Sequence, residues 1–387
     1  MKAVILAAGE GRRLEPLTNV RPKPMLPVAN KPILEYIIEA VRDAGINDII
    51  LIVGYKRDRI QSYFEDGNDW DVDITYAIQE TQLGTGDAVL HAEPYIGDDF
   101  IVLNGDRIIE EEVISAVIEE RKQTEDLIMS VTRVDEPTLY GVVELDRDSV
   151  TAIREQPPQH AVKSDLINAG IYGFGPEIFS AIRQTESNGE LELTKTLNQL
   201  NETRTIRAVR NTGVWLDVTR PWDLLTVNGE LIDTEFRSAS NTPTEFGGAH
   251  VTETTRVNAT ATINPGAVIL RGSAIAQNVS IGANAVIENA IIMEDADIQA
   301  GAIVTDCIVG ANASVGPGTI IEGGLTDVVL DGSIHHDVRF GGIIGDYADI
   351  GGDVTVKPGT RLGNDTIVSS GSVIEDVIPS GARVTRG

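Results

Sequence analysis

The sequence predicts an α/β domain with a mostly parallel sheet, followed by a parallel β-helix. From residue 1 to about 230, short apolar runs alternate with amphipathic stretches, which is the pattern of consecutive β-α-β units. From Val251 onward, apolar β-branched residues recur every six positions, a period that neither an α-helix nor a flat strand produces. At 387 residues the chain is long enough for two domains, because single domains usually span ~100 to 200 residues.

Five apolar runs of the first region are predicted to be strands of the sheet. They cover residues 2–6, 48–53, 74–78, 100–103 and 127–131. Between the first two, Asn30 is expected to cap a helix that has Pro32 in its first turn and stops at Gly45. Ligands of parallel sheets gather at the carboxyl ends of the strands. A binding site is therefore expected where the first strand leads into a loop with two glycines.

A triangular coil with one inward side chain on each flat face explains the six-residue period of the second region. Residues 322–337 break this period and are expected to form a loop expelled from the coil. The single cysteine, Cys307, is expected to be a small buried side chain of a coil. The predicted inward positions are Val251, Val257, Ile263, Ile269, Ile275, Ile281, Ile287, Ile292, Ile298, Val304, Val309, Val315 and Ile321, and then Val338, Ile344, Ile350, Val356, Leu362, Val368 and Ile374.

The α/β domain is predicted to span residues 1–230 and the β-helix residues 251–387. Between them, residues 231–250 contain Asn241-Thr242-Pro243 and Gly247-Gly248 and are expected to form a linker. No apolar run approaches the ~20 residues that a membrane span requires, and the N-terminus enters a strand without an export signal. The protein is therefore expected in the cytoplasm, with no membrane partner.

The chain carries a formal net charge of -28, from 59 acidic and 31 basic residues, of which only 8 are lysines. Nucleic acid is not an expected partner, because its phosphates require a basic surface. An acidic, lysine-poor surface suits a solvent of high ionic strength, where the Debye length shrinks to ~3 Å at 1 M salt. We interpret the composition as that of a salt-adapted, halophilic protein; the alternative is an ordinary acidic protein.

The loop after the first strand has the composition of a phosphate-binding loop. Gly9 and Gly11 allow backbone N–H groups to approach phosphate oxygens without an intervening Cβ. Arg13 adds a planar fork of donors and Lys23 adds a point charge. The loop lacks the Walker A pattern, and Leu14 replaces the third glycine of a dinucleotide-binding fingerprint. Taken alone, these residues also fit a tight turn with solvated arginines.

Longer strings around this loop resemble a known family. Residues 6–18 read LAAGEGRRLEPLT, residues 21–28 read RPKPMLPV and residues 31–34 read KPIL. They resemble the opening of the sugar-1-phosphate nucleotidylyltransferases, and the whole chain resembles archaeal bifunctional members with a hexapeptide-repeat domain. The resemblance implies a Rossmann-like nucleotidyltransferase domain and a left-handed β-helix. It also implies transfer of a nucleotidyl group from a nucleoside triphosphate to a sugar 1-phosphate, with Mg²⁺ as cofactor.

Two aspartates are candidate metal ligands. An N-G-D motif directly follows an apolar strand and places Asp106 at a strand end, where Mg²⁺ can bridge phosphate oxygens. The resemblance implies that Asp106 holds the metal and that a second carboxylate comes from a W-x-D segment, here Asp217. It also implies that Arg13 and Lys23 stabilise the triphosphate and its leaving group. Each aspartate taken alone is equally explained as a turn or capping residue.

Gln79 is the candidate reader of the nucleobase. The resemblance assigns this role to such a glutamine, and its amide offers a donor and an acceptor that match the N3–H and carbonyl edge of uracil or thymine. UTP or dTTP is therefore the expected nucleotide; the alternative is a strand-end glutamine bonded to backbone. Other residues expected around the nucleotide are Leu6, Ala8, Gly9, Gly11, Gly84 and Thr85.

Three further segments resemble the sugar-binding motifs of the family. They imply that Gly141 presents a backbone N–H to the hexose, that Glu155 accepts hydrogen bonds from its hydroxyls, and that Asn168 contacts it. The chain departs from the family at Gln156, where many relatives have a lysine that binds the sugar phosphate. Gln156 carries no charge, so either another cation such as Lys163 substitutes or the sugar phosphate is held more loosely.

The β-helix raises the question of a second activity. Related enzymes with such a domain acetylate amino sugars with the help of a histidine, but Ala300 stands near its expected place and cannot act as a general base. His335 and His336, on the expelled loop, are the remaining candidates. The β-helix is therefore expected to serve in assembly, as a homotrimer. The alternatives are a bifunctional enzyme with acetyltransferase activity and a catalytically silent regulatory homologue.

Overall fold

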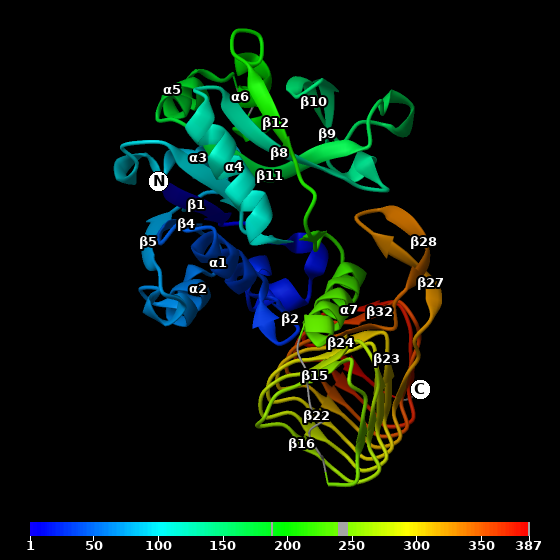
Figure 1. The fold of residues 1–387 in the computed structure, drawn as a ribbon. Helices are drawn as coiled ribbons and strands as arrows, with labels where there is room; N and C mark the ends of the chain where they lie inside the picture. Colours follow the sequence, from blue (N-terminus) through cyan, green and yellow to red (C-terminus); the bar gives the residue numbers. More distant parts are fainter. Residues whose placement is uncertain (187–188, 239–246, 386–387) are drawn as a thin grey trace. The chain divides into compact units, whose positions relative to one another are not determined.

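The computed structural model describes residues 1–186, 189–238 and 247–385. The chain forms two compact units (Figure 1). The sheet unit consists of Met1–Glu10 and Ile33–Leu216, and the β-helix unit consists of Gly11–Pro32 and Asp217–Gly387. The segment Gly11–Pro32 thus packs within the β-helix unit, although it interrupts the sheet unit in the sequence. The domain boundaries near residues 230 and 250 remain predictions.

In the part of the sheet unit that the structure describes, one sheet has nine strands, in the order β5-β4-β1-β6-β11-β8-β12-β10-β9. Strands β5, β4, β1 and β6 are parallel, β11 is antiparallel to β6 and β8, and β12 is parallel to β8. All five predicted strands are confirmed. The strand bounds are β1 (Lys2–Ala7), β4 (Asp48–Val53), β5 (Asp73–Ile78), β6 (Phe100–Asn104), β8 (Leu127–Arg133), β9 (Gly141–Asp146), β10 (Ser149–Glu155), β11 (Leu166–Phe174) and β12 (Ile206–Arg210).

Helices with one apolar face pack on this sheet. Helix α4, for example, contacts β8 and β11, and buries Val113, Ile114 and Val117. The short strand β7 (Arg107–Ile109) pairs with β13 (Trp215–Asp217), which ends the sheet unit. The helix bounds are α1 (Ile33–Asp43), α2 (Arg57–Phe64), α3 (Thr85–Leu90), α4 (Glu111–Gln123), α5 (Glu177–Gln184) and α6 (Leu193–Leu200).

The predicted capping role of Asn30 is wrong. Helix α1 begins at Ile33, directly after the short strand β3 (Lys31–Pro32). The Asn30 side chain instead donates hydrogen bonds to the carbonyl oxygens of Arg256 and Ile275 in the β-helix unit. A side chain that is well suited to capping thus bonds to residues more than two hundred positions away, which no local sequence pattern indicates.

Within residues 247–385, the β-helix consists of three parallel sheets of seven strands each. The first sheet contains β14 (His250–Val251), β17 (Val268–Ile269), β20 (Val286–Glu288), β23 (Ile303–Thr305), β26 (Ile320–Ile321), β31 (Thr355–Val356) and β34 (Val373–Ile374). The second contains β15 (Thr255–Val257), β18 (Ser273–Ile275), β21 (Ile291–Ile292), β24 (Cys307–Val309), β29 (Gly342–Ile344), β32 (Thr360–Leu362) and β35 (Val377–Ile378). The third contains β16 (Thr262–Ile263), β19 (Ser280–Ile281), β22 (Asp297–Ile298), β25 (Ser314–Val315), β30 (Asp349–Ile350), β33 (Ile367–Val368) and β36 (Arg383–Val384). The predicted parallel β-helix is confirmed, and the arrangement is consistent with a left-handed coil.

Among the described residues, the predicted inward side chains form the buried core of this coil or, at Val251 and Val257, pack against it partly buried, with one exception. Ile269 and Ile287 are fully buried, and the small residues two positions earlier, such as Ala267 and Ala285, fill the rest of the interior. Cys307 occupies one of these small-residue positions and is fully buried, as predicted. The six-residue period therefore reports the stacking of one aliphatic side chain per face directly above another.

The exception is Val338, which was predicted to point inward. It pairs with Thr326 in an antiparallel hairpin formed by β27 (Leu325–Leu330) and β28 (Ser333–Arg339) (Figure 1). The coil resumes only at β29, where Ile344 pairs with Val309. Val338 lies six residues before Ile344 and so matches the period, but the expelled segment extends farther than the break in the pattern indicated.

Helix α7 (Pro221–Ser238) packs within the β-helix unit, against β2 (Pro27–Val28) and β18. The buried Asn228 of this helix accepts a hydrogen bond from Ala29 N and donates one to the Gly272 carbonyl oxygen, each of 2.8 Å. The helix includes residues 231–238 of the predicted linker, whereas Asn241-Thr242-Pro243 lies outside the described residues. Of the helices that the structure describes, none is long and apolar enough to cross a membrane.

Candidate functional site

The carboxyl ends of four parallel strands meet at one edge of the sheet unit. Strand β1 leads into Ala8 and Gly9, β4 into Gly54, β5 into Gln79 and β6 into Gly105. Four loops, from segments far apart in the sequence, therefore start side by side. This edge is where sheets of this kind bind their ligands.

Two glycines allow these loops to approach closely. Gly105 N donates a 2.8 Å hydrogen bond to the Leu6 carbonyl oxygen, and a Cβ on Gly105 would come within 2.7 Å of that oxygen. A Cβ on Gly54 would come within 2.7 Å of the Gln79 carbonyl oxygen and 3.0 Å of Ala8 Cβ. The predicted residues Leu6, Ala8 and Gln79 are thus brought together at this edge.

Gln79 is buried at the end of β5, and the donor side of its amide is engaged within the protein. Its Nε2 donates to Asp87 Oδ2 over 2.7 Å and to the Gly84 carbonyl oxygen over 3.2 Å. The group suited to a uracil or thymine is therefore Oε1, which can accept the N3–H of the base. The base-reading role of Gln79 stays a prediction.

Gln82 is a residue at this edge that the sequence reasoning missed. Its Nε2 donates a 2.8 Å hydrogen bond to the Ala8 carbonyl oxygen, which ties the loop after β5 to the loop after β1. Its place between Gln79 and Gly84, two residues already singled out, was the signal that could have identified it.

Gly84 and Thr85 begin helix α3 and are locked against the segment that leads into α6. Gly84 has a φ of +103°, and a Cβ there would come within 2.6 Å of the Leu191 carbonyl oxygen. Thr85 Oγ1 accepts a 3.0 Å hydrogen bond from Leu193 N. Close packing against Leu191 explains why residue 84 is a glycine. The predicted nucleotide contacts of Gly84 and Thr85 therefore stay predictions.

Asp106 lies just beyond β6, and its side chain is partly exposed. Its Oδ1 is 3.9 Å from Arg107 Nε. Across the β6–β11 pair, Gly170 approaches Asn104 so closely that a Cβ would come within 2.5 Å of Asn104 Nδ2. The carboxylate is thus held at a crowded strand end beside the chain that carries the predicted Asn168.

Arg107, which the sequence reasoning also missed, lies between two aromatic rings. Its guanidinium carbon is 4.7 Å from the ring centre of Trp215 and 5.7 Å from that of Tyr140. Trp215 is itself fixed by a 2.9 Å hydrogen bond to the Ala169 carbonyl oxygen. Loss of hydration raises the pKa of Glu155, and the charge of Arg107 opposes that shift, which places a cation close to that predicted sugar-binding carboxylate. A cation directly after the N-G-D motif was the available signal.

Gly141 and Glu155 pair across strands β9 and β10. A Cβ on Gly141 would come within 2.9 Å of Glu155 Oε1, so the glycine makes room for the carboxylate. Loss of hydration raises the pKa of the Glu155 carboxyl, a hydrogen bond with Thr194 opposes that shift, and the charge of Glu192 adds to it. Two of the predicted sugar-binding residues are therefore adjacent.

Asn168 is held by its own strand. Its Nδ2 donates a 2.7 Å hydrogen bond to Tyr172 Oη, and its Oδ1 accepts a 3.0 Å bond from Gly170 N. Burial raises the pKa of Tyr172 to about 12, so its hydroxyl stays protonated at neutral pH. The amide orientation of Asn168 is thus set before any ligand binds.

In the β-helix unit, Lys23 and Asp217 form a buried ion pair. Lys23 Nζ is 3.9 Å from Asp217 Oδ1, and the side chains are 12% and 4% exposed. Thr219 Oγ1 donates a 2.5 Å hydrogen bond to Asp217 Oδ2. Gly11 has a φ of +72°, and a Cβ there would come within 2.7 Å of Lys23 Cβ. Three predicted residues, Gly11, Lys23 and Asp217, are therefore brought together in this unit.

Arg13 contacts the expelled hairpin. Its Nε donates a 2.9 Å hydrogen bond to Asp331 Oδ2 at the tip between β27 and β28, and the side chains are 48% and 60% exposed. Exposed ion pairs of this kind contribute only ~0–1 kcal/mol to stability. A multiply charged phosphate ligand can therefore displace Asp331 from Arg13 at little cost.

Within the described residues, no group of three or more His, Cys, Asp or Glu side chains forms a complete metal site. Mg²⁺ is commonly held by one or two carboxylates together with substrate phosphates, and such a site needs no larger cluster. The partly exposed carboxylate of Asp106 and the carboxylate of Asp217 are hard oxygen donors of the kind that Mg²⁺ prefers. The donor chemistry of these residues therefore fits the ion.

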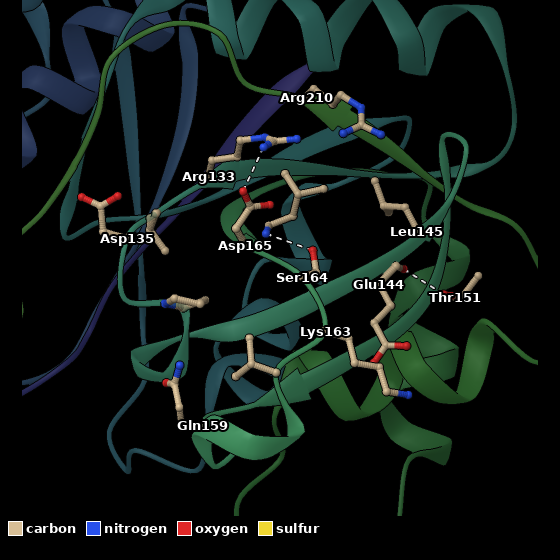
Figure 2. A pocket seen from close by; sticks show the side chains of 14 residues that line it. Arg133, Asp135, Glu144, Leu145, Thr151, Gln159, Lys163, Ser164, Asp165 and Arg210 are labelled. Atoms are coloured by element: carbon tan, nitrogen blue, oxygen red, sulfur yellow. Dashed lines mark hydrogen bonds and ion pairs between the residues drawn. The ribbon is translucent and has the colours of Figure 1, made fainter.

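An open cavity of about 790 Å³ lies beside β9 and β10 (Figure 2). Lys163 and Glu144 lie on one side of it, and Arg133 pairs with Asp165 over 2.9 Å on the other. None of Gly141, Glu155 and Asn168 is among its lining residues. The sequence reasoning named Lys163 as a substitute for the missing lysine at Gln156, but Arg107 is the cation that acts on Glu155.

Comparisons with known proteins agree with this organisation. Residues 2–234 match the model of the nucleotidyl transferase family, and residues 251–377 match the model of the GMPPB C-terminal domain. The chain therefore belongs to the nucleotidyl transferase family. The predicted family is confirmed, as is its combination with a β-helix domain.

Relatives extend over the whole chain. A protein of Methanococcus maripaludis named bifunctional protein GlmU is 36% identical over 97% of this chain and 95% of its own length. The low-salt glycan biosynthesis nucleotidyltransferase Agl11 of Haloferax volcanii is 38% identical over 59% of this chain and 65% of its own length. Among solved structures, a putative glucose-1-phosphate thymidylyltransferase from Bacillus anthracis, in complex with a sucrose, has a TM-score of 0.57 at 28% identity and covers 63% of this chain and 98% of its own.

Proposed function

We propose that the protein transfers a uridylyl or thymidylyl group from UTP or dTTP to a hexose 1-phosphate and releases pyrophosphate. The observation that carries the proposal is the buried pair of Lys23 and Asp217 in a chain of the nucleotidyl transferase family. A cation and a carboxylate are expensive to bury, and phosphate and metal binding explain why both are retained. The substrate class is supported by a relative from Streptomyces griseus named glucose-1-phosphate thymidylyltransferase, which is 37% identical over 60% of this chain and 67% of its own length.

The reaction needs no protein nucleophile. An oxygen of the sugar phosphate attacks the α-phosphorus of the triphosphate, the bond from that phosphorus to the bridging oxygen breaks, and pyrophosphate leaves with the electron pair. The protein has to bring two anions together, align them and neutralise their charge. Arg13 and Lys23 are proposed to bind the triphosphate and the departing pyrophosphate.

The glycines of the first loop support a close approach of phosphate. Among the described residues, a Cβ on Gly9 would meet no heavy atom within 4 Å, so packing does not explain this glycine. Backbone N–H groups near Gly9 are proposed to contact the triphosphate, where a side chain would stand in the way. Asp106 and Asp217 are proposed to hold Mg²⁺, which, when bound, neutralises phosphate oxygens and the leaving group.

The sheet unit is proposed to supply recognition of the base and the sugar. Gln79 Oε1 accepts the N3–H of the pyrimidine, while Glu155 and Asn168 bind sugar hydroxyls and Gly141 donates its backbone N–H. Arg107 is proposed to take the place of the family lysine that Gln156 replaces. Its position over the Trp215 ring supports this role, because stacking fixes the plane of the guanidinium group.

The proposed function is tested by measuring pyrophosphate release over a grid of triphosphates and sugar 1-phosphates, at low and multimolar salt. Turnover that requires both substrates, with UTP or dTTP preferred, is the expected result. Release that is independent of sugar phosphate, or a purine triphosphate as best substrate, contradicts the proposal.

The role of Arg107 has its own test. Arg107→Met is expected to raise the KM for the sugar 1-phosphate about tenfold or more, in line with loss of a charge-assisted hydrogen bond, and to leave the KM for the triphosphate nearly unchanged. Lys163→Met is the matched control, because Lys163 faces the open cavity beside Glu144. A larger effect of Lys163→Met than of Arg107→Met would restore Lys163 as the phosphate ligand.

A second candidate function is acetyl transfer from acetyl-CoA to an amino-sugar 1-phosphate. Full-length relatives named bifunctional protein GlmU favour it. His335 packs against the Trp222 ring at 5.3 Å between ring centres, and His336 Nδ1 lies 3.1 Å from Asp327 Oδ2. Turnover of acetyl-CoA with glucosamine 1-phosphate or galactosamine 1-phosphate tests it. Activity lost in a His335→Ala or His336→Ala variant would identify the base.

We also propose that the β-helix mediates assembly as a homotrimer. The outward side chains of its first sheet include the apolar residues Ile303, Ile320 and Val373, which are exposed, whereas those of the third sheet are mostly polar. Replacement of Ile303 and Ile320 by Asp is expected to dissociate the assembly in light scattering, and an unchanged mass contradicts this. In the same row of the first sheet, Val268 and Val286 are partly exposed, and His250 and Thr355 are polar.

Salt adaptation and a cytoplasmic location complete the proposal. The net charge of -28 supports a protein that works at high ionic strength, where repulsion of anionic substrates is screened. Thermal stability and turnover are both expected to rise from dilute buffer to multimolar KCl. Maximum activity in dilute buffer would contradict the interpretation.

A further inference from the structure

The segment Gly11–Pro32 is fastened to the β-helix at its centre. Arg21 is mostly buried, and its Nη2 donates to Asp346 Oδ2 over 2.5 Å, with Glu294 Oε1 at 3.7 Å. Its Nη1 contacts Met293 Sδ. Removing water from a guanidinium is costly unless a carboxylate faces it, so the observed position of Arg21 depends on Asp346.

Asp346 is itself fixed by the coil. Its side chain is 2% exposed, and its Oδ1 accepts a 3.1 Å hydrogen bond from Ala311 N. Its backbone N–H donates over 2.9 Å to Asn364 Oδ1, and Asn364 Nδ2 donates over 3.2 Å to the Pro16 carbonyl oxygen. Two successive coils therefore hold the segment at two points, Pro16 and Arg21.

These two points lie between the proposed phosphate-binding cations. Pro16 follows Arg13 by three residues, and Arg21 precedes Lys23 by two. A long cationic side chain reaches a phosphate at the productive distance only if its backbone is held in place, and a misplacement of ~1 Å can reduce turnover about 100-fold.

We propose that Arg21 and Asp346 are positioning residues for nucleotidyl transfer, through which the β-helix fixes the backbone that carries Arg13 and Lys23. The inference rests on the proposed function. It gives the β-helix a part in the chemistry of the triphosphate that is separate from assembly and from acetyl transfer. Asn364 supports the same segment through Pro16.

The test compares Asp346→Asn with Asp306→Asn in the full-length protein. Asp306 is a matched control, because it is equally buried at 2% exposure and its carboxylate accepts hydrogen bonds from the Asn289 side chain, the Gly324 backbone and the guanidinium of Arg339. Asp346→Asn is expected to lower kcat about 10- to 100-fold. Asp306→Asn is expected to keep kcat within about twofold of the wild type. Both variants are expected to lower Tm by a similar amount, because each changes a buried carboxylate.

Hydrogen exchange supplies a readout that does not depend on activity. In Asp346→Asn, the backbone amides of residues 11–32 are expected to exchange faster than in the wild type, while those of β5 keep their rates. In Asp306→Asn, the amides of residues 11–32 are expected to exchange as in the wild type. Arg21→Lys, which keeps the charge, is expected to show both effects in weaker form. Arg21→Lys also replaces Asp346→Asn as the test variant if Asp346→Asn does not fold.

Each outcome decides between the two proposals. Unchanged exchange in residues 11–32 overturns the anchoring role of Asp346. Faster exchange with unchanged kcat overturns its role in nucleotidyl transfer. If the wild type transfers no nucleotidyl group to any sugar 1-phosphate tested, the proposed function fails, and the positioning role of Arg21 and Asp346 fails with it. If hydrogen exchange nevertheless responds as expected, Asp346 is a structural anchor of residues 11–32 and nothing more.

Discussion

The two units carry different kinds of predicted site residue. Those in the sheet unit are mostly held by short, directional hydrogen bonds, as in the 2.7 Å contacts of Gln79 with Asp87 and of Asn168 with Tyr172. Those in the β-helix unit are held by ion pairs, as between Lys23 and Asp217. Directional bonds suit discrimination between bases or sugars, whereas ion pairs can be exchanged for phosphate oxygens or a metal. In the proposed mechanism, recognition of base and sugar therefore falls to the sheet unit, whereas charge neutralisation draws on both units, through Asp106 and Arg107 in the sheet unit and Lys23 in the β-helix unit.

The largest expected effect comes from removing the charge of Lys23 in the β-helix unit. Lys23→Met is expected to lower kcat/KM for the triphosphate about 100- to 1,000-fold, because a charge aimed at the reacting phosphates is lost. It is also expected to lower Tm, since the buried carboxylate of Asp217 loses its partner. Lys195→Met, at an exposed site on α6, is the control, and pyrophosphate release with thermal melting gives both quantities. Equal activity of the two variants would remove Lys23 from the mechanism.

The recognition side is tested by Gln79→Ala. We expect kcat/KM for the preferred pyrimidine triphosphate to fall about 10- to 100-fold, because the acceptor for its N3–H is removed. The values for the poorer triphosphates should change much less, so the variant is less selective. Gln123→Ala, at the end of α4, is the control. A uniform fall across all triphosphates would indicate that Gln79 acts on phosphates or on folding.

A smaller effect concerns pH. The pKa of Glu155 is raised above its ordinary 4.5, mainly by loss of hydration. The protonated form, which accepts hydrogen bonds poorly, therefore accumulates at a higher pH than for an exposed glutamate. The KM for the sugar 1-phosphate is expected to rise as pH falls through this raised pKa, and Glu155→Gln should abolish the dependence. A pH profile of KM that is identical in the variant would exclude Glu155 as its cause.

The same shift predicts a change in stability. Because the folded state binds the proton of Glu155 more tightly than the unfolded chain does, the contribution of this group to the free energy of unfolding is largest below pH 4.5 and decreases as pH rises through the folded pKa. Glu155→Gln is expected to gain stability relative to the wild type at neutral pH but not at acid pH, which thermal melting at both pH values measures.

The smallest expected effect concerns the coil itself. Burial raises the pKa of the Cys307 thiol, so the reactive thiolate is rare at neutral pH. A thiol reagent is therefore expected to label the native protein far more slowly than the protein in guanidinium. Rapid labelling of the native state would mean that the coil opens readily and holds the segment Gly11–Pro32 less firmly than its contacts indicate.

The sequence was most informative where structure follows local periodicity. Inward residues such as Ile269 and Ile350 could be named because stacking in a coil repeats every six positions, and the strands of the sheet because each is a short apolar run. The same logic failed at Val338, whose spacing fits the period although a hairpin contains it. It also failed at Asn30, whose partners are set by tertiary packing.

The candidate site was predictable only as a set of residue types. Motifs named Lys23, Asp106 and Asp217, but no motif indicates that Lys23 packs in the β-helix unit. Arg107 was missed because its environment, two aromatic rings from residues 140 and 215, assembles only in three dimensions. Packing across long stretches of chain therefore decides which units hold the site residues, and it leaves little trace in a single sequence.

The bond between Arg21 and Asp346 joins residues 325 positions apart, and that between Asn364 and Pro16 spans 348 positions. During translation, the segment with Arg13 and Lys23 is therefore made more than three hundred residues before its supports. A nascent chain that has completed its sheet thus still lacks the surface on which this segment settles. In the proposed mechanism, full turnover is therefore expected only after the coils that carry Asp346 and Asn364 have been made, and a nascent chain without them is expected to turn over more slowly.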